Sequence, residues 1–432
     1  MPPRPPTPPG DPLLGNTRQF VSDPFGFVRR AAAETGDVFR MRLVGTDVYV
    51  LAGPDAVETA LLDRESFAKL DDFQVAFGDA LLSAEGDQWR RQRHAMEDFF
   101  SPTRVGEYAD TMVDVARRQI ADWTPGDTVG VHRAMGTVAL RNLFEVVLGH
   151  SLDDGELDDI VDEAQALNGW FEPTSWVLPE WVPTPARYRF RRGSAALRER
   201  ADGLLADAGA TPRGESLLAT LSALASDPDS GFDRAEVLDQ VVGMLFAGHE
   251  TTAFSMACAL HQLGAHPAVA ERLHDELATV LDGPPTLADL QELSYLDRMI
   301  NETFRLYPAV HAIPRVTTDA VEVDGHAIPS GATVLCSVWS IHRDDRFYDD
   351  PLAFDPDRWA ETTPRERGYR FVPFGAGPRI CIGRHMARLE AKATLATIGQ
   401  RFGLDAEGSL DVSPKMTTQP DGPVPIRLSE RP

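Results

Sequence analysis

The chain has 432 residues, of which 43% are hydrophobic, 8% aromatic and 25% charged, a composition typical of globular rather than disordered or collagen-like proteins. Its 42 basic residues against 66 acidic ones give a net charge of −24, which argues against a nucleic-acid partner. No apolar run reaches the roughly 18 residues of a membrane-spanning helix. The N-terminal stretch also lacks the apolar region of a secretory signal.

The three cysteines, Cys258, Cys336 and Cys381, are odd in number and lie far apart in the sequence. This usage argues against a disulfide framework and for a reducing compartment. We therefore expect a cytoplasmic protein.

The order of patterns along the chain predicts a mainly helical α+β fold. Residues 1–15 are proline-rich and are expected to lie extended on the surface, before a single domain over 16–432. Helical patterns dominate from about 88 to 281, and the end of the chain is expected to be loop-rich. Strands are predicted in a hairpin over 36–52 and at 316–323 and 333–339, and a late helix over about 384–402.

One predicted helix is unusually long. It begins at Asp233, in a capping-box pattern with Glu236, and ends near Gly264 and Pro267. About 31 residues at roughly 1.5 Å each give a rod on the order of 45 Å. Apolar residues on several faces predict that this helix is buried, although its middle carries the polar insert of residues 248–252.

The most specific segment is the glycine-rich loop of residues 371–383, which holds one cysteine just before a predicted helix. Backbone N–H groups and the helix dipole favour the thiolate form of Cys381, which is the form that binds metal. A buried structural cysteine is the alternative. Zinc, iron–sulfur and covalently attached haem sites each need further ligands that this sequence does not supply near Cys381.

The spacing Phe-x-x-Gly-x-Arg-x-Cys-x-Gly over 374–383 resembles the haem-binding loop of the cytochrome P-450 family. The resemblance covers nearly the whole chain and implies that family's single triangular-prism fold, with a long central helix and small β-sheets. It also implies haem b, with the thiolate of Cys381 as the proximal iron ligand, a ligand type that favours O–O cleavage. The residues implied to contact haem from this loop are Phe374, Gly375, Arg379, Cys381 and Gly383.

Two further segments match structural motifs of the same family. Glu302 and Arg305 lie three residues apart on a helix, a spacing that alone is most often an exposed surface pair. The resemblance implies instead a buried triad with Arg358 that supports the cysteine loop. It also implies that Arg315 pairs with a haem propionate.

The polar insert of the long helix is similar to the family's oxygen-activation site. A zinc-protease motif is excluded because Ala253 stands where the second histidine would be needed. A tolerated helix irregularity is the alternative, but a glutamate among apolar residues is costly to bury. The resemblance implies that Ala247 and Gly248 border the haem, that Thr251 orients oxygen and a water, and that Glu250 relays protons.

Trp89 and Arg93 match a fourth motif, in which both side chains reach one haem propionate, and Arg379 is expected at the other. A basic surface helix is the alternative. A basic patch on an acidic protein would suit an acidic electron donor such as ferredoxin with its reductase. The arginines expected to form this patch are Arg90, Arg91, Arg384 and Arg388.

Together these residues predict a monooxygenase that uses O2 and two externally supplied electrons to hydroxylate or epoxidise a hydrophobic small molecule. Apolar stretches expected to line the substrate pocket include 73–77, 80–82 and 167–178, with Trp170, Trp176 and Trp181 in a possible lid. A terpenoid, steroid, fatty acid or macrolide-like substrate is compatible. Peroxide-driven oxygenation by the same fold and a non-catalytic haem sensor are the alternatives.

Overall fold

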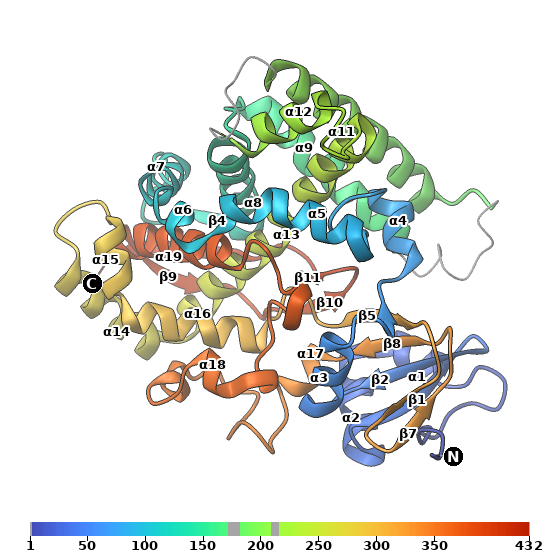
Figure 1. Ribbon diagram of the computed structural model, residues 1–432. Helices are drawn as coiled ribbons and strands as arrows, with labels where there is room; N and C mark the ends of the chain where they lie inside the picture. The colour runs from blue at the N-terminus through green and yellow to red at the C-terminus, as the bar shows by residue number, and fades with distance from the viewer. Residues whose placement is uncertain (1, 172–181, 209–215, 432) are drawn as a thin grey trace. The chain divides into compact units, whose positions relative to one another are not determined.

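The structure is a computed structural model that describes residues 2–171, 182–208 and 216–431. The backbone contacts divide the chain into two compact units (Figure 1). Residues up to 71 together with 304–381 form the first, and residues 72–303 together with 382 onward form the second. Trp176 and Trp181, expected in a lid, lie outside the described residues. A boundary between a leading segment 1–15 and a domain over 16–432 stays a prediction.

The first unit is built around a five-stranded sheet in the order β1-β2-β8-β5-β3. The predicted hairpin is confirmed, because β1 and β2 pair antiparallel from Val38↔Leu51 to Leu43↔Thr46, while β2 and β8 run parallel. The strands are β1 Val38–Leu43, β2 Thr46–Leu51, β3 Phe67–Ala68, β5 Ile313–Thr317 and β8 Thr333–Cys336, and a separate hairpin pairs β6 Val321–Val323 with β7 His326–Ile328.

Alternating side chains give this sheet two apolar faces. Phe39 and Met41 pack with Phe27 of helix α2, whereas Val38 and Leu51 pack with the residues of α3 on the other face. The helical segments are α1 Thr17–Ser22, α2 Pro24–Thr35, α3 Pro54–Leu62, α17 Val338–Ile341, η4 Pro356–Trp359, α18 Pro364–Arg367, η5 Gly368–Arg370 and η6 Gly377–Arg379. In this unit the proline-rich start of the chain is bound rather than free, since Pro6 O accepts from Arg40 N at 2.8 Å.

The second unit is mainly helical. Its helical segments up to the central helix are α4 Asp71–Phe77, α5 Gly86–Met96, η1 Glu97–Phe100, α6 Pro102–Gly106, α7 Ala109–Gln119, α8 Val131–Asn142, the π-helix η2 Leu143–Leu148, α9 Asp154–Ala166, η3 Leu167–Phe171, α11 Pro185–Ala208 and α12 Leu217–Ser226. Those that follow are α13 Arg234–Ala265, α14 Pro267–Val280, α15 Leu287–Glu292, α16 Ser294–Leu306 (whose last turn belongs to the first unit) and α19 Arg384–Arg401.

The long helix is confirmed as α13, with 32 residues, and it packs against α8, α11, α19 and β9. The carboxylate of Asp233 caps it by accepting from Glu236 N at 2.7 Å. The backbone stays helical through the polar insert of residues 248–252. There the hydroxyl of Thr251 donates to Ala247 O, one turn earlier, at 2.8 Å, and the helix continues unbroken. None of the described helices is long and apolar enough to cross a membrane.

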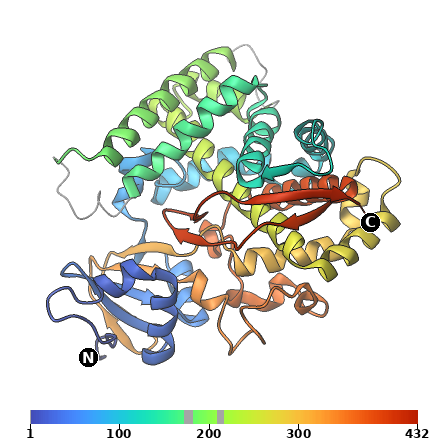
Figure 2. The ribbon, with the colours of Figure 1, turned by 180° about the vertical axis from the view of Figure 1, so that it is seen from behind.

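The prediction of a loop-rich C-terminus is wrong in part, because this segment forms strands. β9 Phe402–Ala406 and β4 Thr128–Gly130 flank β12 Pro425–Glu430, and β10 Val412–Pro414 pairs with β11 Thr418–Pro420. Figure 2 shows the long strands of this segment in red, side by side. Strand β12 alternates buried Ile426 and Leu428 with outward residues, but its partner β4 lies almost 300 residues earlier, which a local pattern does not reveal.

Candidate haem and oxygen-activation site

The cysteine loop of the first unit is folded tightly onto helix α3. The amide of Cys381 donates to Phe374 O at 2.9 Å, and Gly375 N donates to Val372 O at 3.0 Å. Gly377 has a φ of +66°, and a Cβ there would lie 2.8 Å from Leu61 O of α3. Glycine is therefore required at 377 both for its backbone conformation and for its close packing.

Cys381 is the cysteine that this fold leaves accessible. Cys258 and Cys336 are fully buried, whereas Cys381 is exposed. Burial raises the pKa of the Cys336 thiol to about 12, so that this thiol stays protonated in the folded protein at neutral pH. Elsewhere in the described chain no group of three or more His, Cys, Asp or Glu side chains could hold a metal ion. The accessible sulfur of Cys381 therefore fits a group that binds the protein through a single thiolate.

Two arginines of the first unit lie at the edge of the sheet beside the cysteine loop. Arg315 is buried on β5, and Arg379 Nη1 donates to Phe67 O of the neighbouring strand β3 at 2.8 Å. The loop approaches the same edge, because a Cβ on Gly375 would lie 3.5 Å from Ile313 at the start of β5. Two cations next to an accessible cysteine suit a flat ligand with carboxylates, which is the character of haem.

Two arginines, one buried and one partly exposed, bind backbone carbonyl groups of residues 342–353. Arg305 is fully buried, and its Nη1 donates to His342 O and Pro351 O, both at 2.7 Å. Arg358 Nη1 donates to Asp349 O at 2.8 Å. Glu302 is also fully buried, so the alternative of an exposed surface pair is wrong. The triad of Glu302, Arg305 and Arg358 stays a prediction.

Packing also fixes the phenyl ring of Phe374. It meets Phe304 edge to face, with ring centroids 5.2 Å apart. The ring is therefore held in place within the cysteine loop, as a group that shields a thiolate from water would need to be.

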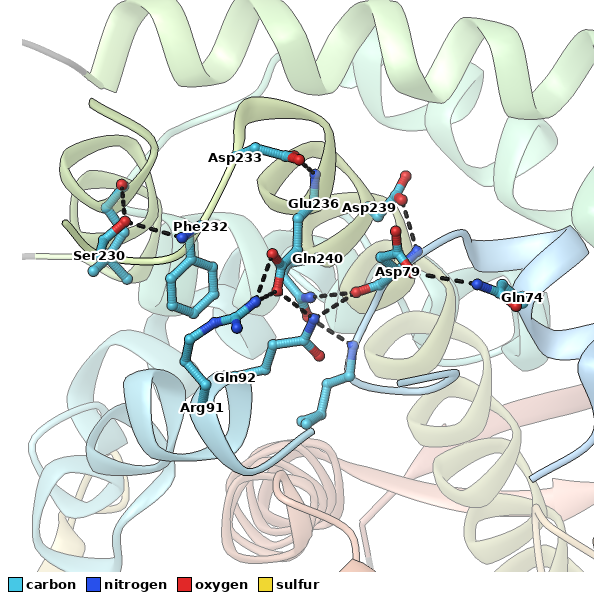
Figure 3. A network of polar contacts seen from close by, with 12 residues as sticks. Gln74, Asp79, Arg91, Gln92, Ser230, Phe232, Asp233, Glu236, Asp239 and Gln240 are labelled. Atoms are coloured by element: carbon cyan, nitrogen blue, oxygen red, sulfur yellow. Dashed lines mark hydrogen bonds and ion pairs between the residues drawn. The ribbon is translucent and has the colours of Figure 1, made fainter. Parts of the chain in front are cut away.

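In the second unit, helix α5 carries Trp89, which is buried, and Arg93, which is partly exposed. A polar network fixes this helix to the first turn of α13 (Figure 3). Arg91 Nη2 donates to both carboxylate oxygens of Glu236 at 2.8 Å, and Gln92 Nε2 donates to Oε1 at 2.7 Å. The capping-box glutamate thus binds α5 in addition to beginning α13.

The same network holds the backbone of residues 79–81, which overlap the stretch 80–82 expected to line the substrate pocket. Asp79 N donates to Asp239 Oδ2 at 2.7 Å, and Leu81 N donates to Gln240 Oε1 at 2.8 Å (Figure 3). Arg198 of α11 pairs with Asp239 at 2.5 Å. Gly243 allows the approach, because a Cβ there would lie 3.0 Å from Ala80 Cβ.

The middle of α13 exposes a narrow stripe on an otherwise buried helix. Ala247 is exposed, and Met244, Gly248 and Thr251 are partly exposed, at a spacing that places them on one face. Small residues at 247 and 248 leave room for a bulky neighbour close to the helix backbone. The adjoining Phe246 ring packs against Phe77 of α4, with centroids 5.0 Å apart.

Glu250 points into a buried polar pocket of the second unit. Asn168 Nδ2 of η3 donates to its two carboxylate oxygens at 3.1 and 3.0 Å, Thr417 Oγ1 donates at 3.4 Å, and Gln419 Nε2 of β11 donates to Oε1. Burial raises the pKa of Glu250, although these hydrogen bonds and the charge of Lys415 act in the opposite direction.

The structure shows different surroundings for the four arginines expected to bind an electron donor. Arg91 pairs with Glu236, and Arg388 donates to Asn301 Oδ1 at 2.7 Å, with Asp297 at 3.8 Å. Arg90 is exposed beside Asp87, and Arg384 is partly exposed at the start of α19. Arg90 is thus the exposed member of the four, paired with Asp87, whereas the other three arginines are partly exposed.

Sequence reasoning did not identify Asn168, Thr417, Gln419, Glu236 or Gln240 as parts of these networks. Their partners lie about 80 to 170 residues away in the sequence. A buried helix with several polar residues in its first turns was the one local signal, because such residues require partners.

Each unit carries features that agree with a haem-thiolate oxygenase: the first has an accessible cysteine in a glycine loop, and the second has a buried helix with an exposed stripe of small residues. The family model for cytochrome P450 matches residues 5–426. The chain belongs to the cytochrome P450 family.

Relatives agree over nearly the full length. The chain is 33% identical to cyclooctat-9-en-7-ol 5-monooxygenase of Streptomyces melanosporofaciens, over 92% of this chain and 89% of the relative. It is 32% identical to pentalenene oxygenase of Streptomyces avermitilis, over 93% and 92%. It is 30% identical to cyclooctatin synthase of Streptomyces melanosporofaciens, over 91% and 88%.

The predicted class, fold and cofactor are thereby confirmed. The chain is a mainly helical α+β monooxygenase that uses haem with a cysteine thiolate ligand, O2, a redox partner and a hydrophobic small-molecule substrate. When bound, haem activates O2 with two electrons and transfers one oxygen atom to the substrate. The protein contributes binding, orientation and protons.

Proposed function

We propose that this monooxygenase hydroxylates or epoxidises a cyclic terpenoid. The observation that carries this proposal is the likeness, over more than nine-tenths of the chain, to relatives named for cyclooctat-9-en-7-ol and pentalenene. The stripe of Ala247 and Gly248 beside Phe246 is in keeping with a rigid apolar substrate, which packs against small and aromatic groups.

We propose that the following residues bind haem. In the first unit, the thiolate of Cys381 binds the iron, Arg315 and Arg379 bind propionates, and Phe374 and Gly375 shape the loop. In the second, Trp89 and Arg93 bind a propionate, and Ala247, Gly248 and Gly383 contact the ring. The accessible sulfur of Cys381 and the clustering of two arginines at the sheet edge support these assignments.

Thr251 and Glu250 are the proposed catalytic residues. Thr251 lies on the exposed stripe of α13, where its hydroxyl can orient a water and oxygen. Glu250 is buried behind that stripe, and burial raises the pKa of its carboxyl group, which favours the protonated form that a proton donor needs. The proton moves from solvent to the Glu250 carboxyl and onward to the water held by Thr251.

We further propose that ferredoxin, reduced by its reductase, supplies the electrons. Arg90 is exposed, and the other three arginines of the expected docking patch, Arg91, Arg384 and Arg388, are partly exposed. Docking by charge predicts an association rate that falls as salt is added. A cytoplasmic location is proposed because the three cysteines form no disulfide.

Turnover with labelled oxygen tests the function. Holoprotein is titrated with cyclic terpene hydrocarbons, and a haem spin-state change identifies ligands for turnover with ferredoxin, its reductase and ¹⁸O2. We expect one labelled oxygen atom per product molecule. Peroxide-driven product formation at the same rate, or no spectral response to cyclic terpenes with a clear one to fatty acids, would contradict the proposal.

Thr251→Ala distinguishes catalysis from mere haem binding. Loss of the hydroxyl is expected to divert electrons into free peroxide while substrate still binds. Unchanged product per electron would show that Thr251 has no role in oxygen activation.

A further inference from the structure

The carboxylate of Glu250 is surrounded by neutral donors that come from two separate parts of the second unit. Asn168 lies on η3 and reaches both carboxylate oxygens, whereas Thr417 and Gln419 come from the end of the chain, at or next to β11. All four side chains are more than nine-tenths buried. Three neutral side chains from two distant parts of the sequence thus donate hydrogen bonds to the carboxylate of Glu250.

The charged and titratable groups around Glu250 are few. η3 and β11 contain none, Lys415 in the turn before β11 is exposed, and His249 lies on α13 itself. Burial lowers the pKa of His249 to about 4 and also lowers that of His132 on α8, so both imidazoles are neutral at pH 7. Within the described part of the chain, no arginine or lysine is within ion-pair distance of Glu250.

We propose that Asn168 and Gln419 are positioning residues of the proton relay, which form a neutral clamp that fixes the Glu250 carboxyl group without holding it permanently ionised. This inference rests on the proposed relay role of Glu250. Thr417, whose contact is longer, completes the clamp.

The choice of amides over cations has a direct chemical consequence. A bound arginine would favour the carboxylate strongly and hinder its protonation, whereas a donor amide favours it less. The clamp therefore restricts the side chain to one orientation and leaves the proton exchangeable. Removing one donor to a charged acceptor is expected to raise the proton affinity of Glu250 about tenfold, which is one pH unit.

Near-isosteric variants test the clamp. Asn168→Leu and Gln419→Met keep the branching and length of the side chains and remove the amide. As a control, Gln262→Met removes a similarly buried amide from α13, about three turns from Glu250. Infrared titration of the carboxylic C=O band, assigned by its loss in Glu250→Gln, measures protonation independently of turnover. Peroxide released per electron is measured on the same holoproteins.

The clamp predicts that the titration midpoint of Glu250 rises by about one pH unit in Asn168→Leu and in Gln419→Met. Both variants should also release severalfold more peroxide per electron. Gln262→Met should change neither the midpoint nor the peroxide. Unchanged midpoints in both folded, haem-loaded variants would overturn the clamp. If Glu250→Gln itself released no extra peroxide, the proposed relay would be wrong, whatever the clamp variants showed. If one variant fails to load haem, the other carries the test.

Discussion

Helix α13 carries two buried glutamates whose surroundings differ. Glu236, in the first turn, meets the guanidinium of Arg91 at 2.8 Å together with the amide of Gln92. Glu250, four turns later, meets only neutral donors. A carboxylate that joins helices gains from a permanent cation, whereas one that transfers protons must be able to lose its charge. Partner type thus separates the structural acid from the proposed catalytic one.

The largest expected effect is on catalysis, at the acid with neutral partners. Glu250→Gln should lower coupled product formation about 100-fold, because an amide cannot relay protons. Stability should change little, since the amide keeps the volume and some of the hydrogen bonds. The amounts of product and of peroxide formed per electron measure the effect on catalysis. Unfolding in guanidinium chloride measures the effect on stability. If Glu250→Gln kept its normal yield of product per electron but lost stability, Glu250 would be the structural acid rather than the catalytic one.

At the other acid the effect should fall on stability. Glu236→Gln removes a buried charge from Arg91 and should cost about 2 kcal/mol, less than for a fully buried pair because the arginine side chain is 36% exposed. The unfolding midpoint measures this loss. The yield of product per electron in the folded fraction should stay normal. A Glu236→Gln variant that is stable but releases extra peroxide would contradict the assignment of Glu236 as the structural acid.

Another buried glutamate, Glu390, shows how a carboxyl group without a cation partner responds to pH. Burial raises the pKa of Glu390 on α19 to about 8, and the neutral amide of Asn142 acts in the opposite direction. The folded protein therefore keeps a proton that the unfolded chain releases above about pH 4.5, so stability falls as pH rises from there to about 8. Glu390→Gln should flatten this slope, by up to about 1.4 kcal/mol per pH unit. An unchanged slope would show that Glu390 does not keep its proton.

Gln240 accepts from Leu81 N and donates to Asp79 O, so its replacement should affect both stability and the substrate site. Gln240→Ala should cost about 1 kcal/mol per lost hydrogen bond. It should also broaden the product distribution, because residues 79–81 are held less firmly. Product analysis against Gln262→Ala, a buried amide further along the same helix, measures the effect. An unaltered distribution would show that this segment does not shape the substrate site.

Much of this fold could be predicted from local patterns. The first hairpin alternates clearly, and α13 has its Asp233 cap and a glycine–proline end, so both were found close to their true bounds. Strands β9 and β12 were missed, and β12 also pairs with β4, almost 300 residues earlier, a pairing that leaves little local trace in the sequence. The cysteine loop is a contiguous motif and was recognised. The partners of Glu236 and Glu250 could not be, because tertiary contacts alone bring them together.

The carbon monoxide complex of the reduced protein tests the central claim most directly. If the thiolate of Cys381 binds haem iron, the wild type will show the red-shifted Soret band that a thiolate ligand gives, and Cys381→Ser will lack it. Cys258→Ser should keep the band, because that cysteine is fully buried on α13. A red-shifted band that persists in Cys381→Ser would contradict the account.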